Sequence, residues 1–257
     1  MFPRWVNIPG TLTLLACVAA WEGAIQSGLV TFDYLPAPSG ILVAFLELVR
    51  SGELLTNTTH TLRSIVLGWI AASAIGLALG LIFGLSPLVR RYCLASIEVL
   101  RPLPAIAFLP AALLLFSFSL TTELIVIIYA SLWPMFVNTM GGVANVASRL
   151  HDVSRTLQLS QLRTLTTVVV PAAAPAILVG LRLSMGTAVV MAIIAEMLGN
   201  PHGLGYAVVS ALQAMRPERM FAYVLFVGVL AIALNACLLQ AERRVLRGYG
   251  GGVASHA

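Results

Sequence analysis

Six stretches of this chain are long, apolar and almost free of charge, and they constrain its fold more than any other feature. They cover about residues 11–30, 62–85, 103–119, 124–144, 177–198 and 221–240. Runs of roughly 18 such residues have the length that a helix needs to cross about 30 Å of hydrocarbon. The third stretch is interrupted, because Pro102, Pro104 and Pro110 fall in or just before it. The pattern predicts an all-α polytopic membrane protein with six transmembrane helices, and a charged fraction of only 10% agrees.

The arginines predict how these spans are oriented. All fifteen basic residues are arginine. If the N-terminus is cytoplasmic, ten of them fall in the ends and loops on the cytoplasmic side and four on the outer side. Positive residues favour cytoplasmic loops, so we expect both termini to lie in the cytoplasm. The net charge of +5 does not indicate nucleic-acid binding, because the arginines are spread over three loops and a tail without interleaved aromatic residues.

Small residues repeat along one face of the second stretch. Gly68, Ala72, Gly76, Gly80 and Gly84 stand at every fourth position and form a flat groove on a helix. Grooves of this kind let the backbone of another helix approach closely. The partner is either another helix of the same chain or a helix of a second copy.

No residue pattern in the chain indicates covalent chemistry. The motifs HExxH and GxSxG are absent, and the chain has no lysine. Without lysine it cannot contain the phosphate-binding loop GxxxxGK[ST], whose lysine reaches the β- and γ-phosphates of ATP. We therefore expect no enzyme activity from this chain. If it transports a solute actively, the energy comes from an ion gradient or from another subunit.

The carboxylates favour another subunit as the energy source. Secondary transporters usually show paired intramembrane carboxylates or an inverted repeat. Here Glu22 and Glu196 are the only carboxylates well inside the predicted spans, and no repeat is evident. Because a carboxylate at a helix centre costs about 2.5–3.5 kcal/mol, Glu22 should lie near the outer interface or be paired. Glu196 is either an interfacial anchor or a pathway residue. The alternatives are a stand-alone secondary transporter or channel, and a structural scaffold.

Two segments outside the spans have amphipathic helical patterns. Residues 35–55 alternate apolar and charged positions at helical spacing, which predicts a helix on the outer surface. Residues 145–176, here called the coupling segment, predict two short amphipathic helices on the cytoplasmic side with a bend near Gln158. Pro171 and Pro175 are expected to stop the helix and return the chain to the bilayer. A membrane subunit would offer such a projecting element to a separate motor.

The coupling segment also carries a family resemblance. DVSRTLQLSQLRTLTTVVVPAAAPAILVGLRL, residues 152–183, resembles the coupling segment of ABC-importer permeases, the binding-protein-dependent transport inner-membrane components. The family pattern runs Glu-Ala-Ala, three residues, Gly, and then Leu-Pro. Residues 152–154 stand where Glu-Ala-Ala would, Gln158 where the glycine would, and Val170 and Pro171 where Leu-Pro would. A non-glycine residue at positive φ costs about 1–2 kcal/mol, so Gln158 disfavours the usual bend.

Five further stretches extend the resemblance over nearly the whole chain, to the nitrate, sulfonate and taurine branch of these permeases. They are LPAPSGIL (35–42), SIVLGWIAASAIGLALGLIFGLS (64–86), RPLPAIAFLP (101–110), AEMLGNPHGLGYAV (195–208) and LLQAERRVLRG (238–248). The resemblance implies a type I ABC importer permease fold over residues 1–248, in the bacterial inner membrane. The Gly-rich remainder, residues 249–257, is expected to be a disordered tail.

The same resemblance implies the partners. Two ABC ATPase subunits would bind ATP and Mg and dock on the cytoplasmic side, so this chain itself would hold no cofactor and no metal. A periplasmic substrate-binding protein would deliver the solute. A second permease copy, most simply as a homodimer in the membrane lipid, would form the pathway between the two copies. The branch implies a small anion or organic nutrient, of the sulfonate, nitrate or bicarbonate class.

Two sets of site residues are expected. The residues expected to form the ATPase-coupling surface are Asp152, Arg155, Thr156, Leu157, Gln158, Ser160, Gln161 and Arg163. The translocation pathway is expected beside the kink that Pro134 introduces into the fourth span, because polar or soft side chains there could line a cavity. Its candidates are Trp133, Asn138, Met185, Met191 and Glu196. For both methionines, ordinary core packing is an equally good interpretation.

Overall fold

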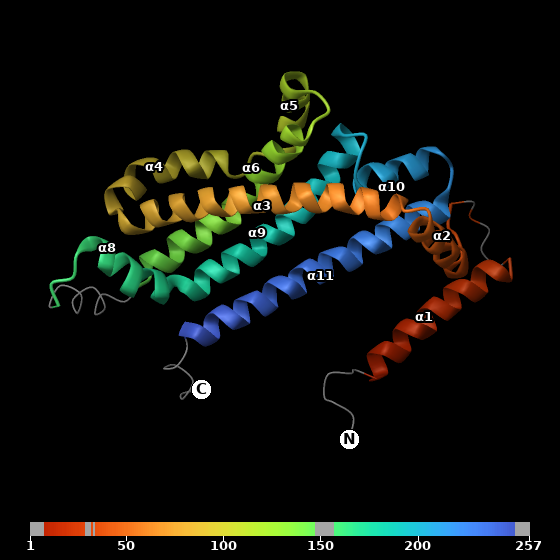
Figure 1. The fold of residues 1–257 in the computed structure, drawn as a ribbon, viewed down its shortest axis with the longest axis horizontal. Coiled ribbons are helices and arrows are strands. Elements are labelled where there is room, and N and C mark those ends of the chain that lie inside the picture. The colour runs from red at the N-terminus through yellow and green to blue at the C-terminus, as the bar shows by residue number, and fades with distance from the viewer. Residues whose placement is uncertain (1–7, 29–31, 33, 147–156, 250–257) are drawn as a thin grey trace.

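The computed structural model of the chain describes residues 8–28, 32, 34–146 and 157–249, and every regular element in these ranges is helical (Figure 1). The predicted all-α class is therefore confirmed. The elements are α1 (Ile8–Gln26), α2 (Pro38–Arg50), α3 (Glu53–Leu85), α4 (Pro87–Leu100), the 3₁₀-helix η1 (Ala105–Phe108), α5 (Leu109–Phe116), α6 (Leu120–Ala144), α8 (Gln161–Thr164), the π-helix η2 (Leu165–Val169), α9 (Val170–Gly199), α10 (Leu204–Gln213) and α11 (Pro217–Tyr249). The tail predicted to be disordered lies outside the described residues, except for Tyr249.

Four helices in the described part of the chain are long and apolar enough to cross a membrane. They are α3, α6, the continuous helix Gln161–Gly199 and α11. A fifth span results if Pro87–Leu100 and Ala105–Phe116, which are bent by 77° relative to each other, count as one. Pro102 and Pro104 lie at that bend, where the sequence predicted an interruption of the third apolar stretch. The predicted count of six is not confirmed, because α1 is not among these helices.

The core is a layer of three long helices in which α6 packs along both α3 and α9 (Figure 1). The small residues of α3 face α6. A Cβ added to Gly68 would lie 2.4 Å from Ile127 Cγ2, and one added to Gly80 would lie 2.5 Å from Thr139 Cβ. Distances this short require glycine at these positions. The partner of the small-residue groove is therefore a helix of the same chain.

The prediction that the prolines stop the helix is wrong. Pro171 stands in the first turn of α9 and Pro175 lies inside it, and the chain is helical without a break from Gln161 to Gly199. The reason lies in the preceding turn, where residues Leu165–Val169 form a π-helix. A proline clashes with the carbonyl of residue i−4 in a regular α-helix, and the wider π-turn just before Pro171 changes this spacing.

The amphipathic helix predicted within residues 35–55 is confirmed as α2. Its buried residues Ile41, Ala44 and Leu48 pack in one cluster with Ala222 and Tyr223 of α11. α1 joins this cluster through Trp21, whose ring lies 6.4 Å from that of Phe221. α11 then runs from the α2 and α10 side of the molecule toward the side that carries α8 (Figure 1). We call these two sides the α10 end and the α8 end.

Glu22 in α1 is paired, as predicted for a carboxylate in an apolar helix. The Ser39 hydroxyl donates to Glu22 Oε1 at 2.7 Å, and the Ser39 backbone N–H donates to Oε2 at 2.9 Å. The Gln26 amide, one turn further along α1, also donates to this carboxylate. Glu22 therefore fixes the end of α1 to the start of α2.

No sequence pattern predicted α4. Its start is well marked, because the Ser86 hydroxyl accepts a hydrogen bond from Val89 N at 3.3 Å and Pro87 stands in the first turn. None of its described residues is buried in the single chain, and Leu88 and Tyr92 are 66% and 71% exposed. A helix with exposed apolar residues and two adjacent arginines has neither the length nor the pattern of a span. From the sequence alone, α4 could therefore not be distinguished from a loop.

Candidate functional site

The described part of the predicted coupling surface lies at the α8 end and is exposed. Leu157, Gln158, Ser160, Gln161 and Arg163 are all exposed there. Asp152, Arg155 and Thr156 lie outside the described residues.

The turn at Gln158 adopts the conformation that usually requires glycine. Gln158 has φ of 49°, in the left-handed region. A side chain costs about 1–2 kcal/mol in this conformation. The chain therefore still bends at this position, although a glutamine stands where the bend favours glycine.

A capped helix end follows this turn. The Ser160 hydroxyl accepts a hydrogen bond from Arg163 N at 3.4 Å, so Ser160 is the N-cap of α8. Leu157, before the cap, and Leu162, after it, are 64% and 71% exposed. Exposed apolar side chains on an ordered and capped turn form a surface suited to contact with another protein.

The five pathway candidates lie in different surroundings within the single chain. Asn138 lines an open pocket of about 620 Å³ between α6 and α9, together with Gly141, Gly142, Pro175 and others. Its amide donates to the carbonyl of Pro134 at 2.8 Å. Trp133 packs edge-on against Tyr129, with ring centres 5.7 Å apart.

Both methionines lie in the apolar core. Met185 is 7% exposed and belongs to the buried cluster of Ile65 and Ile127, and Met191 packs against this cluster from the side. The geometry therefore agrees with the packing interpretation for Met185 and Met191. Glu196 lies apart from them, among buried polar residues at the α10 end.

Glu196 belongs to a group of six polar residues that joins α3, α6 and the end of α9. We call this group the polar cluster, and it consists of His60, Thr61, Ser64, Glu123, Glu196 and Asn200. Glu123 is 1% exposed and Glu196 is 0% exposed. Two fully buried carboxylates are rare in proteins unless each has compensating partners.

The loop after α9 folds over the carboxylate of Glu196. Glu196 Oε2 accepts hydrogen bonds from Thr61 Oγ1 at 3.0 Å and from Gly205 N at 2.9 Å. Gly203 has φ of 97°, and a Cβ there would lie 2.3 Å from Glu196 Cδ. The motif GNPHGLG therefore needs Gly203 and Gly205, because the backbone at these two positions passes directly over the side chain of Glu196. Glu196 is therefore fully buried within this chain.

Glu123 is held from two sides, and His60 lies between the two carboxylates. The Ser64 hydroxyl donates to Glu123 Oε2, and the Asn200 amide donates to Glu123 Oε1. His60 Nδ1 is 3.7 Å from Glu196 Oε1, and His60 Nε2 is 3.9 Å from Glu123 Oε1. With 24% of its side chain exposed, His60 is the cluster member open to the surface among these three.

Glu123 and His60 were not predicted as site residues, because both lie just outside the apolar stretches. Glu123 precedes the fourth stretch by one residue, and His60 precedes the second by two. Each therefore resembled a polar flank of a span. The available signal was the spacing of His60 and Ser64, which are four residues apart and so share one face of a helix.

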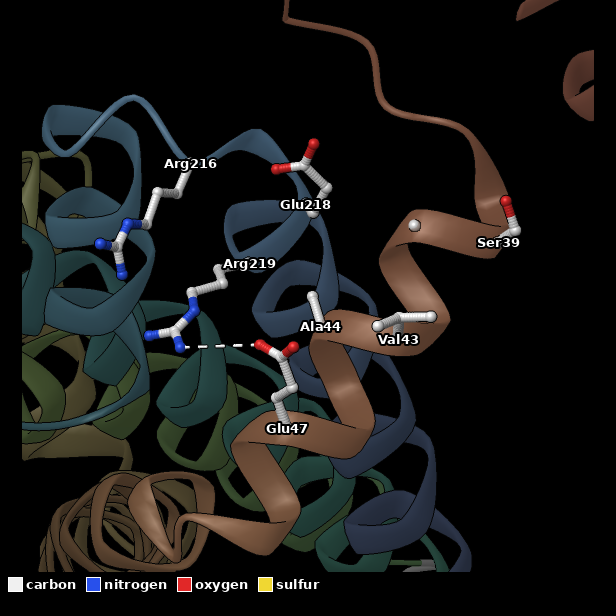
Figure 2. A pocket seen from close by; sticks show the side chains of 8 residues that line it. Ser39, Val43, Ala44, Glu47, Arg216, Glu218 and Arg219 are labelled. Atoms are coloured by element: carbon white, nitrogen blue, oxygen red, sulfur yellow. Dashed lines mark ion pairs between the residues drawn. The ribbon is translucent and has the colours of Figure 1, made fainter. Parts of the chain in front are cut away.

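A second pocket, of about 550 Å³, opens at the α10 end between α2 and the start of α11 (Figure 2). The guanidinium of Arg219 lies 3.8 Å from Glu47 Oε2 and 3.7 Å from Glu53 Oε2. Arg216 and Glu218 also line this pocket, and both are exposed. The surface therefore presents charges of both signs around a small hollow.

A family model agrees with the resemblance found in the sequence. The model described as "Binding-protein-dependent transport system inner membrane component" matches residues 58–248, which begin inside α3 and end one residue before the end of α11. The match contains both the polar cluster and the described part of the coupling segment.

Several proteins with sequences similar to this chain are named as transport permeases. The putative aliphatic sulfonates transport permease protein SsuC of Bacillus subtilis (strain 168) is 30% identical over 244 residues, which cover 95% of this chain and 88% of that protein. The nitrate import permease protein NrtB of Leptolyngbya laminosa is 31% identical over 186 residues, which cover 72% of this chain and 67% of that protein. Among solved structures, a chain of the inward-facing MetNI methionine ABC transporter superposes with a TM-score of 0.62 at 18% identity, covering 74% of this chain and 93% of that one. This likeness confirms the type I importer permease fold.

Proposed function

Because the chain belongs to the family of binding-protein-dependent transport system inner membrane components, we propose that it works in an importer whose solute is a small anion of the sulfonate or nitrate class. Membership makes it a permease component and not a catalytic subunit. The solute class rests on the names of the relatives that match this chain, and these names refer to aliphatic sulfonates and to nitrate. Solute would pass along α6 and α9, between this chain and a second copy.

One observation carries the mechanism. The helix from Gln161 to Gly199 is continuous, so it joins the exposed turn at the α8 end directly to the polar cluster at the α10 end. At 1.5 Å per residue, its 39 residues span about 58 Å. A displacement of the turn would therefore be passed to a helix that packs along α6 and also contacts α3. Alternating access would use this helix as its lever.

The exposed turn is the proposed contact for the ATPase subunits. The exposed leucines Leu157 and Leu162 would enter an apolar groove on the partner, with Arg163 beside them. ATP-driven closure of two such subunits would push on residues 152–163 of both permease copies and open the cavity on the opposite side. The positive-inside pattern supports a cytoplasmic position for this turn.

The α10 end would then face the periplasm and receive the binding protein. The pocket in Figure 2 supports this assignment, because paired charges around a hollow, here Glu47 with Arg219, suit a transient and polar interface. The exposed Arg216 could form an additional ion pair with an acidic residue of the partner.

The substitution Leu157→Arg tests the docking surface. A buried charge at an interface anchor is expected to lower ATPase stimulation by loaded binding protein at least about tenfold and to weaken co-purification of the ATPase. The matched control is Leu55→Arg, which changes a leucine of similar exposure, 69%, at the α10 end. The control should leave co-purification intact.

Two results would contradict the proposal. One is Leu157→Arg with normal assembly and normal stimulated hydrolysis, which would remove the turn from the interface. The other is gradient-driven uptake by this chain alone in proteoliposomes, which would make it a secondary transporter or channel.

A further inference from the structure

We propose that the polar cluster binds one divalent metal ion of the Zn²⁺ class, between His60, Glu123 and Glu196. The three side chains come from α3, α6 and α9, so the ion would join the three core helices at the α10 end. This inference does not rest on the proposed transport function, because it concerns only residues within one chain.

The geometry of the three residues is close to that of a metal site. One candidate ligand atom from each residue lies within 4.8 Å of the others. The ligand atoms of a tetrahedral zinc site, at about 2.1 Å from the ion, are about 3.4 Å apart. His60 Nδ1 and Glu196 Oε1 are already 3.7 Å apart. Small side-chain rotations would therefore bring all three residues onto one ion.

Unpartnered acceptor atoms point to a cation at this place. Glu196 Oε1 and Asn200 Oδ1 are buried and accept no hydrogen bond from any described residue, and His60 Nδ1 likewise has no hydrogen-bond partner there. Glu196 is 0% exposed and Asn200 is 6% exposed, so bulk water does not replace the missing donors. A buried acceptor without a donor costs about 1–3 kcal/mol. A metal ion would satisfy these lone pairs together, with Asn200 Oδ1 as a fourth ligand.

The charge balance supports the same conclusion. Two buried carboxylates carry a charge of −2 when ionised, and the ion pairs that the described residues give them are with His60 alone. The nearest aromatic neighbour of His60 is His202, with ring centres 5.8 Å apart, and it adds no negative charge. A divalent cation neutralises both carboxylates while leaving the imidazole neutral, which is the form that binds metals.

The donor set selects the class of metal. One imidazole nitrogen together with carboxylate and amide oxygens suits Zn²⁺ and similar first-row ions, whereas Ca²⁺ and Mg²⁺ prefer sites of oxygen ligands only. The partly exposed edge of His60, beside the exposed His202, gives the ion a path from the surface. Ser64, which donates to Glu123, and Gly205, which donates to Glu196, would orient the two carboxylates as outer partners.

Zinc content of the purified full-length chain tests the proposal. Cys17, Cys93 and Cys237 are free and exposed and would bind zinc themselves, so the experiment uses a chain with all three changed to serine and a purification tag without histidine. The protein is stripped with EDTA, incubated with Zn²⁺, desalted and measured by elemental analysis. We expect about one zinc per chain and a thermal midpoint raised by zinc. Glu123→Gln and Glu196→Gln should each lower the zinc content at least fivefold, and the exposed control Glu98→Gln should not.

A second measurement leaves the polar cluster unchanged, so its result does not depend on whether the glutamine variants fold. Cobalt(II) loaded into the cysteine-free chain should show visible absorption of a four- or five-coordinate nitrogen and oxygen site, displaced by zinc. The proposal is overturned if the stripped chain retains no zinc, if Glu123→Gln and Glu196→Gln fold and bind zinc as the control does, or if cobalt shows only the spectrum of the hydrated ion. If Ca²⁺ raises the thermal midpoint as much as zinc does, the assignment of the site to the Zn²⁺ class is also wrong.

Discussion

The two ends of the continuous helix Gln161–Gly199 are built in opposite ways. At the α8 end the helix begins in an exposed turn, with a strained glutamine and two leucines that face outward. At the α10 end it finishes in a buried polar cluster under a loop whose glycines touch the carboxylate of Glu196. One end therefore exposes apolar side chains on an ordered turn, whereas the other holds three helices together through buried polar contacts.

The largest effect is expected from Gly205→Ala, which adds a methyl group where the loop packs against α9 at the α10 end. The added Cβ would lie 2.3 Å from the carbonyl oxygen of Ile193 and 2.9 Å from Glu196 Cβ, and the first of these atoms is backbone that cannot rotate away. We expect a loss of about 3 kcal/mol or more of stability and little folded protein, seen as a lost monodisperse peak in size-exclusion chromatography.

Gly186→Ala is the matched control, because it lies in α9 but an added Cβ there meets no described atom within 4 Å. It should fold normally, since alanine favours helix over glycine by about 1 kcal/mol. A well-folded Gly205→Ala protein with an unchanged thermal midpoint would contradict the close contact between the loop and α9.

A smaller effect on folding, but a clear effect on transport, is expected from Glu196→Gln. The amide keeps one acceptor oxygen for Thr61 or Gly205 and removes the negative charge. A hydrogen bond to a charged group contributes about 1.5–3 kcal/mol, so the contacts that join α9 to α3 and α10 should weaken without being lost. We expect solute uptake to fall about tenfold while the amount of folded protein in the membrane stays near normal. Uptake assays with parallel quantification of the protein measure this. Unchanged uptake would assign Glu196 to packing alone.

The smallest effect is expected at the α8 end, from Gln158→Gly. Glycine adopts the observed φ of 49° without the cost of a side chain, so the turn should gain about 1 kcal/mol of local stability. Hydrogen exchange of residues 157–164 should become slower. Gln161→Gly, at the first residue of α8, should have the opposite sign, because glycine is unfavourable in a helix. Faster exchange in Gln158→Gly would show that the turn does not hold this conformation.

Packing patterns were predictable from the sequence because they repeat. The small residues of α3 predicted a close helix contact, and the structure identifies α6 as the partner through Gly68 and Gly80. The spacing of apolar residues predicted α2, and the family motifs predicted the fold.

Polar contacts were less predictable, because they depend on which helices meet. Glu123 resembles a flanking residue until Ser64 and Asn200 are seen around it. Likewise Pro171 and Pro175 predicted a stop, because the sequence gives no sign of the π-turn that keeps the helix continuous. Pairings across 59 to 135 residues, such as that of Thr61 with Glu196, are set by tertiary structure.

We propose that the turn at Gln158 faces the cytoplasm and binds the ATPase, while the opposite end of α9 faces outward. Single cysteines at Leu162 and at Leu55, in a chain with Cys17, Cys93 and Cys237 removed, test this directly with a membrane-impermeant maleimide. The account predicts that cysteine at Leu55 is labelled in intact spheroplasts, whereas cysteine at Leu162 is labelled only in inverted vesicles and is protected when the ATPase is bound. Labelling of the Leu162 position from outside the cell, or no protection by the ATPase, would contradict it.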